Sequence, residues 1–101
     1  MGLAARDRNF RVMLAGAVVV VTVGFAYDVS SGSWAALLVC LGIVLGAEAV
    51  NTAIEQLADR VQPEQDPAIR DVKDLAAGAV LVVSVAAAVV GVVVLWPYVV
   101  G

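Results

Sequence analysis

Histidine is absent from this chain of 101 residues, and Cys40 is its only cysteine. These absences exclude a Ser-His-Asp triad, a histidine-ligated zinc site and a disulfide within the chain. The sequence also has no Gly-x-x-x-x-Gly-Lys-Ser/Thr loop and no glycine-rich loop of the protein kinase type. Any nucleotide chemistry must therefore differ from that of those two classes. A net charge of -3 gives no indication of a nucleic-acid surface.

Charged residues are also scarce. They make up 15% of the chain, whereas 62% of the residues are hydrophobic. A typical soluble domain has about a quarter charged and about half apolar residues. A soluble domain of this size has too much surface for its volume to bury so many apolar side chains. The composition therefore predicts an integral membrane protein.

Three apolar runs occupy residues 12–27, 34–54 and 75–100. A helix needs about 20 residues to cross the hydrocarbon core, and the first run reaches this length with Phe10 and a snorkelling Arg11. We predict an all-α fold with one domain over residues 1–101. Its membrane helices are expected at about residues 10–28, 34–58 and 67–96, joined by a loop at about 59–74.

The basic residues predict the orientation in the membrane. They precede the first apolar run or lie between the second and third: Arg6, Arg8, Arg11, Arg60, Arg70 and Lys73. The positive-inside rule therefore places the N-terminus and the 59–74 loop in the cytoplasm. A secretory signal peptide is the alternative for residues 1–27, but Asp7 is unusual there and no small-x-small cleavage site precedes Asp28.

Turn and helix-breaking residues suggest where the helices end. Residues 30–33 (Ser-Ser-Gly-Ser) read as a tight outer turn. Pro63 is expected to end the second helix, and Asp66 to cap a third helix that has Pro67 at its first position. This third helix is expected to stop near Pro97.

A polar stripe follows the second apolar run. Glu48, Asn51, Glu55 and Asp59 fall within about 80° of arc on a helix, and Glu48 would lie about 20 Å into the bilayer. A carboxylate at such depth costs at least about 2.5–3.5 kcal/mol, so it usually faces protein or water and serves a function. A structural hydrogen bond between helices is the alternative, and Asn51 alone would suffice for it. Two glutamates on one face favour a functional site.

The two glutamates are expected to do different work. They are about 10 Å apart along the helix and cannot share one small ion. Glu48 is the more desolvated and suits proton abstraction, whereas Glu55 at the membrane boundary suits Mg²⁺ together with substrate phosphates. Lys73 is a natural point charge for phosphate, with a snorkelling lysine on a solvated face as the alternative. Because three helices hardly shield such a stripe from lipid, we infer a homo-oligomer.

These residues resemble a known family. Glu48-x-x-Asn51-Thr-Ala-Ile-Glu55, then Asp59, then Lys73-Asp74-x-Ala-Ala-Gly-Ala-Val is similar to the prokaryotic diacylglycerol kinases, which are small three-helix membrane kinases. The residues of both motifs look more like the undecaprenol kinase branch than the diacylglycerol kinase branch. The segment Arg-Asn-Phe-Arg at residues 8–11 also resembles the family's Glu-Arg-Asn-Phe-Arg.

The resemblance implies a homotrimeric helical bundle in the bacterial inner membrane, with active sites shared between protomers. It also implies ATP- and Mg²⁺-dependent phosphorylation of a lipid hydroxyl, with undecaprenol as the expected lipid. The roles that it implies are Glu48 as general base, Asn51 orienting the reacting groups, Glu55 and Asp7 holding metal, Lys73 contacting phosphate, and Asp59, Glu64, Gln65, Asp66 and Asp74 near the nucleotide.

Two departures and three alternatives remain at this stage. The family usually has glutamate at Asp7, and it carries an amphipathic surface helix where this chain has only residues 1–6, so a shortened chain or an incomplete nucleotide site is expected. The alternatives are a diacylglycerol kinase, a non-catalytic relative and an ion-conducting oligomer. The last requires a polar face across the whole membrane, which Val39, Ile43 and Leu45 do not continue.

Overall fold

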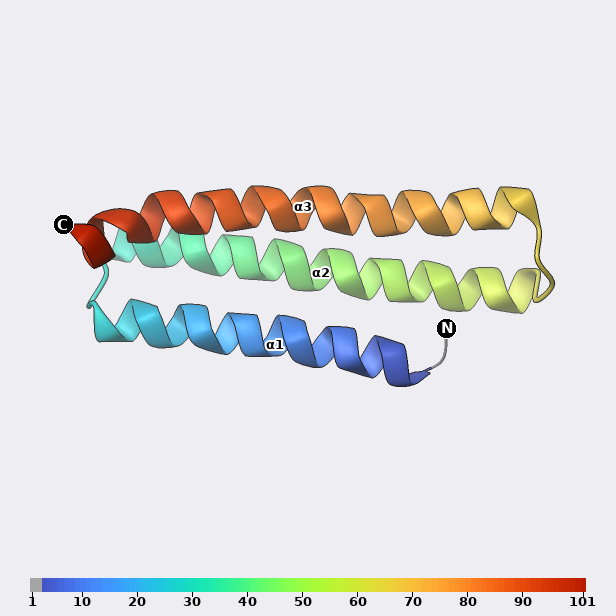
Figure 1. The fold of residues 1–101 in the computed structure, drawn as a ribbon, viewed down its shortest axis with the longest axis horizontal. Coiled ribbons are helices and arrows are strands. Elements are labelled where there is room, and N and C mark those ends of the chain that lie inside the picture. Colours follow the sequence, from blue (N-terminus) through green and yellow to red (C-terminus); the bar gives the residue numbers. More distant parts are fainter. Residues whose placement is uncertain (1–2) are drawn as a thin grey trace.

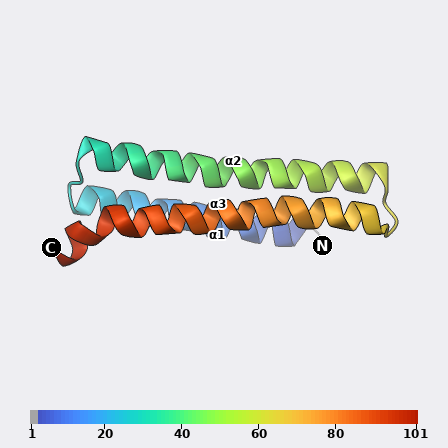
Figure 2. The same ribbon diagram turned by 90° about the horizontal axis from the view of Figure 1, so that it is seen from above.

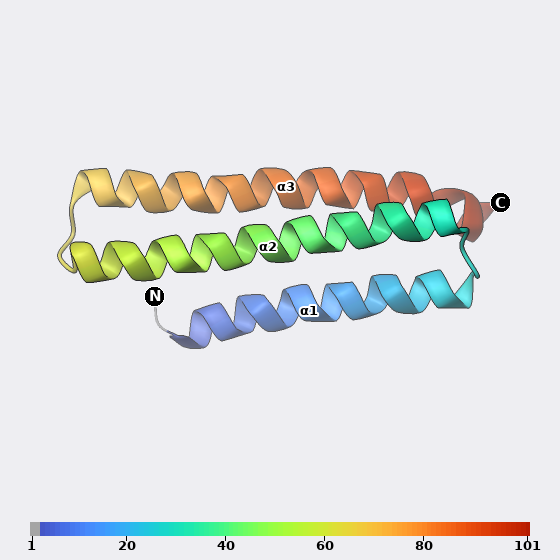
Figure 3. The ribbon, with the colours of Figure 1, turned by 180° about the vertical axis from the view of Figure 1, so that it is seen from behind.

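Three long α-helices form an elongated bundle of 53 × 21 × 19 Å in the computed structural model. The structure describes residues 3–101, with side chains from Arg8 onward. The helices are α1 (Leu3–Ala26), α2 (Ser31–Val61) and α3 (Pro67–Val100). They run up, down and up again, with α2 and α3 side by side along their length (Figures 1 and 3). The predicted all-α architecture is confirmed.

All three helices are long and apolar enough to cross a membrane. Among the described side chains, the only buried hydrophobic ones are Val29, Leu37 and Ala58, whereas Phe25 and Leu75 are 74% and 78% exposed. In lipid the helices satisfy their own backbone polar groups, and apolar side chains on the surface need no protein cover. The fold is that of a membrane protein, with its apolar residues facing outward.

Residues 27–30 form the turn between α1 and α2, and we refer to this end of the bundle as the turn end. The turn begins with a Schellman motif. Asp28 has a positive φ of 49°, and the Val29 and Asp28 amides donate to the carbonyls of Gly24 and Phe25 over 3.2 Å each. This pattern satisfies the last carbonyls of α1 and reverses the chain. Val29 is buried, which supplies the hydrophobic contact that accompanies such a cap.

A tryptophan ring closes the contact between α1 and α2 at this end. The ring of Trp34 packs against Gly24, where an added Cβ would lie 2.5 Å from its Cη2 atom. It also meets Phe25 with ring centroids 4.9 Å apart and planes tilted by 58°. Only glycine permits this approach. Trp34 is therefore a packing residue between α1 and α2.

The start of α2 differs from the prediction. Residues 31–33 are helical, because the Ser30 hydroxyl caps the helix by accepting from the Ser33 amide over 3.2 Å. A serine at this position satisfies one of the orphan amides of the first turn. The Tyr98 hydroxyl accepts from the Ser30 amide and bonds the Ser33 hydroxyl, each over 3.0 Å. The end of α3 is thus tied to the beginning of α2.

The expected end of α3 near Pro97 is wrong. The helix continues to Val100 with Pro97 inside it, and the chain bends there (Figures 1 and 2). Proline removes one helical hydrogen bond and crowds the carbonyl four residues earlier, which bends a helix. The last turn is kept by the Gly101 amide, which donates to the Pro97 carbonyl over 3.0 Å.

At the opposite end, residues 62–66 form the loop between α2 and α3. We refer to this as the loop end. The Gln62 amide donates to the Ala58 carbonyl over 2.9 Å and closes α2, one residue before Pro63. The Asp66 carboxylate accepts from the Ala68 amide over 2.8 Å and starts α3, with proline at the first position. The predicted cap and the predicted stop at Pro63 are both present.

Candidate functional site

One face of α2 carries the polar stripe and turns toward α3. Leu37, Asn51 and Ala58 are the buried residues of this helix, and they are spaced by multiples of seven. Residues seven apart lie almost in line on a helix, because two turns take about 7.2 residues. Glu48 and Glu55 lie three to four residues from Asn51 and therefore flank this line. The predicted stripe faces the interior of the helix pair.

Asn51 is the buried polar residue of the site. It is 8% exposed, and its Nδ2 donates to Glu55 Oε1 over 3.2 Å. Its Oδ1 atom is buried and has no hydrogen-bond partner. A buried acceptor without a partner lowers the stability of the fold by about 1–3 kcal/mol, so such an atom in a native protein needs an explanation. A hydrogen-bond donor or a cation that comes with a ligand would give Asn51 Oδ1 its missing partner.

Glu48 is half-buried and ends the polar stripe. On the same helix face, the next residues toward the turn end are Val44, Leu41 and Leu37, which are all apolar. The carboxylate therefore lies where a polar face gives way to an apolar one. The described residues of this face offer no polar path toward the turn end, which is the continuation that an ion-conducting oligomer would need.

Lys73 connects α3 to the same stripe. Its Nζ atom forms an ion pair with Asp59 Oδ1, and both side chains are about half exposed. Asp59 follows Glu55 by one turn, which is about 6 Å along the helix. The fold thus brings the predicted phosphate-contacting lysine to within one turn of the predicted metal-binding glutamate, although 18 residues of sequence separate them.

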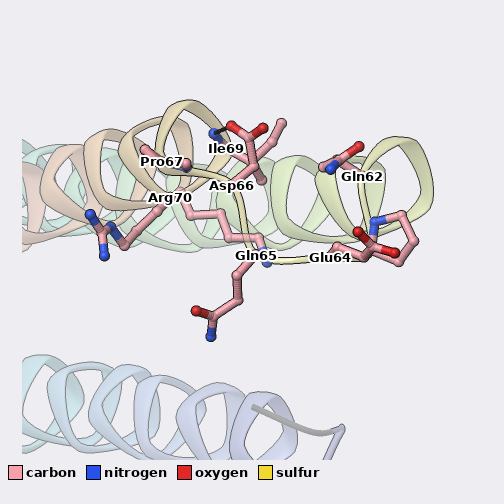
Figure 4. A pocket seen from close by; sticks show the side chains of 9 residues that line it. Gln62, Glu64, Gln65, Asp66, Pro67, Ile69 and Arg70 are labelled. Atoms are coloured by element: carbon pink, nitrogen blue, oxygen red, sulfur yellow. Dashed lines mark hydrogen bonds between the residues drawn. The ribbon is translucent and has the colours of Figure 1, made fainter.

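A pocket of about 450 Å³ lies at the loop end (Figure 4). Its lining includes four of the predicted nucleotide residues: Glu64, Gln65, Asp66 and Lys73. It also includes Gln62 and Arg70, which the prediction of site residues omitted. Arg70 precedes Lys73 by three residues, and this spacing on one helix face was the signal for including it. In Figure 4 the Gln65 side chain extends from the loop toward the side on which α1 lies.

The remaining predicted residues are placed less closely together. Asp66 uses Oδ1 to accept from the Ala68 and Ile69 amides, so this oxygen serves the helix cap. Asp74 is exposed on α3, outside the pocket lining. Asp7 falls within the range of α1, but its side chain lies outside the described ones. The predicted pairing of Asp7 with Glu55 at a metal stays a prediction.

The donor atoms suit a metal ion only in part. From Arg8 to Gly101, no three histidine, cysteine or acidic side chains come together as a ready-made metal site. Mg²⁺, however, commonly takes one or two carboxylates and completes its shell with water and substrate phosphates. Glu55 supplies one carboxylate, and the unpartnered Asn51 Oδ1 is a neighbouring neutral oxygen. This set fits a phosphate-bound Mg²⁺ and does not fit a metal held by the described side chains alone.

Comparison with known proteins adds an independent finding. Residues 2–95 match the protein family described as prokaryotic diacylglycerol kinase. The chain is 33% identical over 94 residues to the undecaprenol kinase of Bacillus subtilis, an alignment that covers 93% of this chain and 76% of that protein. It is 34% identical over 73 residues to the diacylglycerol kinase of Pseudomonas aeruginosa, with 72% and 59% covered. No solved structure matches.

Proposed function

Because the chain belongs to the prokaryotic diacylglycerol kinase family, we propose that it transfers the γ-phosphate of ATP to the hydroxyl of undecaprenol in the bacterial inner membrane. The observation that supports this most is the placement of the half-buried Glu48 at the border between an apolar and a polar helix face. A lipid alcohol would approach from the apolar side and a nucleotide from the loop end. The family itself establishes the coarser class, a membrane lipid kinase.

In the proposed reaction, Glu48 takes the proton of the lipid hydroxyl as its oxygen attacks the γ-phosphorus. A new oxygen–phosphorus bond forms, the bond to the β-phosphate oxygen breaks, and ADP leaves. General-base assistance of this kind contributes typically about 10²–10⁴ in rate. A base at membrane depth suits this substrate class because a lipid hydroxyl stays near the headgroup region.

Lys73 serves the phosphates in this proposal. Its ammonium group already reaches the α2 stripe, where it pairs with Asp59. A γ-phosphate at this height would offer a stronger, multiply charged partner, and charge-assisted contacts to phosphate are among the stronger hydrogen bonds. Glu64, Gln65, Asp66 and the exposed Asp74 would surround the rest of the nucleotide at the loop end.

Glu55 and the Asn51 Oδ1 atom would hold a phosphate-bound Mg²⁺, with Asp7 as the proposed further ligand. The ion would neutralise charge on the transferring phosphoryl group, which together with positioning is the main contribution to phosphoryl transfer. The Nδ2 bond from Asn51 fixes the orientation of the Glu55 carboxylate. In this proposal Asn51 would therefore orient the Glu55 carboxylate toward the ion.

The proposal includes a homotrimer with the N-terminus in the cytoplasm. Gly42 and Gly46 are exposed on α2, and a Cβ added to either would meet nothing within 4 Å. Small residues of this kind let helices of other protomers approach closely in a membrane. This face points away from the carboxylate stripe, so the partner helices would contact α2 on its other side.

The lipid identity is the first thing to test. Purified protein in bicelles receives labelled ATP-Mg²⁺ with undecaprenol or with diacylglycerol, and the labelled lipid phosphate is followed. We expect transfer to undecaprenol, and we expect Glu48→Gln to abolish it while size-exclusion chromatography shows an unchanged assembly. Asp71→Asn, on the exposed face of α3, is the matched control. Transfer to diacylglycerol alone would favour the second candidate, and transfer to neither lipid would contradict the kinase proposal.

A further inference from the structure

A long apolar groove runs between α1 and α3 with α2 as its floor. Its volume is about 650 Å³. All three helices line it, and nearly all of the lining is apolar. The lining includes Gly16 of α1, Leu37 and Val44 of α2, and Ser84, Gly91 and Val99 of α3. The view from above shows α1 and α3 on the same side of α2, which leaves this floor between them (Figure 2).

The groove leads to Glu48. Its floor residues Leu37, Leu41 and Val44 precede Glu48 on one face of α2, at spacings of four, three and four residues. Val44 lies one turn from Glu48, which is about 6 Å along the helix. From Ser84 to Val99 the groove extends about 22 Å along α3, toward the turn end. A molecule that occupies it with its polar end at Glu48 would place its apolar remainder wholly among apolar side chains.

The size of the groove selects the kind of occupant. Counted at about 30 Å³ for each water-sized group, a figure that also approximates a methylene, it has room for about 20 such groups. The groove therefore has room for one hydrocarbon chain along its length.

Two glycines keep the middle of the groove open. Gly16 of α1 and Gly91 of α3 both line it, and a Cβ added at either position would meet nothing within 4 Å. Counted in helical turns from the turn end, both residues lie about 14 Å deep. The space at this level thus depends on the absence of two side chains and can be filled by substitution.

We infer that this groove binds the first 20 or so carbons of a single-chain lipid alcohol and delivers its hydroxyl to Glu48. The inference rests on the proposed function and names the feature that selects the substrate. A polyprenol has one chain and its hydroxyl at the chain end, which matches one groove whose lining stops one helical turn short of one carboxylate. A diacylglycerol would have to leave one of its two chains outside.

The first test is a chain-length series with the wild-type protein. Prenyl alcohols of two, three, four, six and eleven isoprene units are presented at equal mole fraction in bicelles with ATP-Mg²⁺. Contacts remote from the reacting atom raise kcat/KM by positioning it, so kcat/KM should rise by about tenfold up to about four units, where the groove is full, and then stay level. A steady rise to eleven units, or no dependence on length, would overturn the inference.

Gly91→Phe tests the groove itself. Its aromatic ring occupies the space of several carbons, so the plateau should arrive about one isoprene unit earlier and the KM for longer alcohols should rise, while the two-unit alcohol keeps its kcat/KM. Val89→Phe is the matched control, because Val89 is 57% exposed on the same helix and does not line the groove. Equal effects of the two substitutions, or a changed oligomeric state specific to Gly91→Phe, would contradict a lipid-chain site.

A labelling experiment does not depend on any variant. A three-unit alcohol that carries a diazirine at the end remote from the hydroxyl is photolysed with the wild-type protein, and adducts are mapped by mass spectrometry. Adducts are expected on the lining residues Leu95 and Trp96, and excess undecaprenol should suppress them. Adducts only on α3 residues outside the groove lining, such as Val89 and Val93, would refute the inference. If the wild-type protein phosphorylates no alcohol, the proposed function fails, whereas turnover without groove labelling defeats the inference alone.

Discussion

Replacing Asn51 by leucine should separate stability from activity. The substitution keeps the number and branching of the side-chain heavy atoms and removes both polar atoms. In the native protein, the buried Oδ1 atom has no partner, which costs about 1–3 kcal/mol. The bond from Nδ2 to Glu55 is lost in return, and hydrogen bonds in membrane proteins contribute about 0.6 kcal/mol on average. The difference predicts that Asn51→Leu is more stable than the wild type by about 0.5–2 kcal/mol.

Activity should change in the opposite direction. If Asn51 orients Glu55 and completes the shell of a phosphate-bound cation, its loss removes one preorganised polar contact, and such a loss typically lowers kcat by about 10²–10³. The assay pair is reversible unfolding in mixed micelles, followed by circular dichroism, and lipid phosphorylation with ATP-Mg²⁺. Gln56→Leu, at an exposed position of the same helix, is the control and should change neither quantity.

The reasoning would be refuted by a variant that unfolds more easily than the wild type and loses activity in proportion. That result would make Asn51 a structural link between α2 and α3, the alternative that the sequence left open. A variant with unchanged activity would also refute it, because the unpaired acceptor would then serve no ligand.

Three further changes concern stability and one concerns the nucleotide. Gly24→Ala forces a Cβ into the Trp34 ring and should destabilise the fold by about 1–3 kcal/mol in the same unfolding assay. Tyr98→Phe removes the acceptor of the Ser30 amide bond and should cost about 1 kcal/mol, which unfolding also measures. Asp66→Ala removes the cap of α3, about 1 kcal/mol, and should raise amide hydrogen exchange in its first turn. Lys73→Gln should raise the KM for ATP about tenfold or more, measured at saturating lipid.

Three of these four changes, those at Gly24, Tyr98 and Lys73, have a matched control in the chain. Gly16→Ala, on the same helix, meets open space and should not lower stability, unlike Gly24→Ala. Tyr27→Phe, the control for Tyr98→Phe, tests whether loss of any tyrosine hydroxyl destabilises the turn end. Asp71→Asn removes an exposed charge from α3 near Lys73 without touching the pocket lining. If a control substitution changes the measured stability or KM as much as the variant it is paired with, the contact assigned to that variant does not explain the change.

The sequence was sufficient to predict the parts of the fold that depend on local chemistry. Apolar length predicts three membrane helices, and Asp66 followed by proline predicts the cap that begins α3. The polar stripe follows from helical periodicity alone. These features require no knowledge of neighbouring helices, since each is determined by residues within a few turns.

What the sequence did not predict depends on contacts between distant segments. Residues 31–33 look like a turn, but the Ser30 cap and Tyr98 from the end of α3 stabilise them as helix. Pro97 looks like a helix end, but a bent helix continues past it. The ion pair of Lys73 with Asp59 and the apolar groove likewise arise only when α2 and α3 lie together. A local sequence pattern does not predict contacts between segments that are distant in the sequence.

The ties between α2 and α3 restrict how the molecule moves. Tyr98 joins these helices at the turn end, and Lys73 joins them at the loop end, so neither helix slides along the other without breaking a polar contact. The axial register of Glu48 and Lys73 is therefore set before any substrate arrives. Among the described side chains, α1 has fewer such links, and they concentrate around Trp34. Any opening of the bundle would therefore begin at α1, while α2 and α3 keep their register.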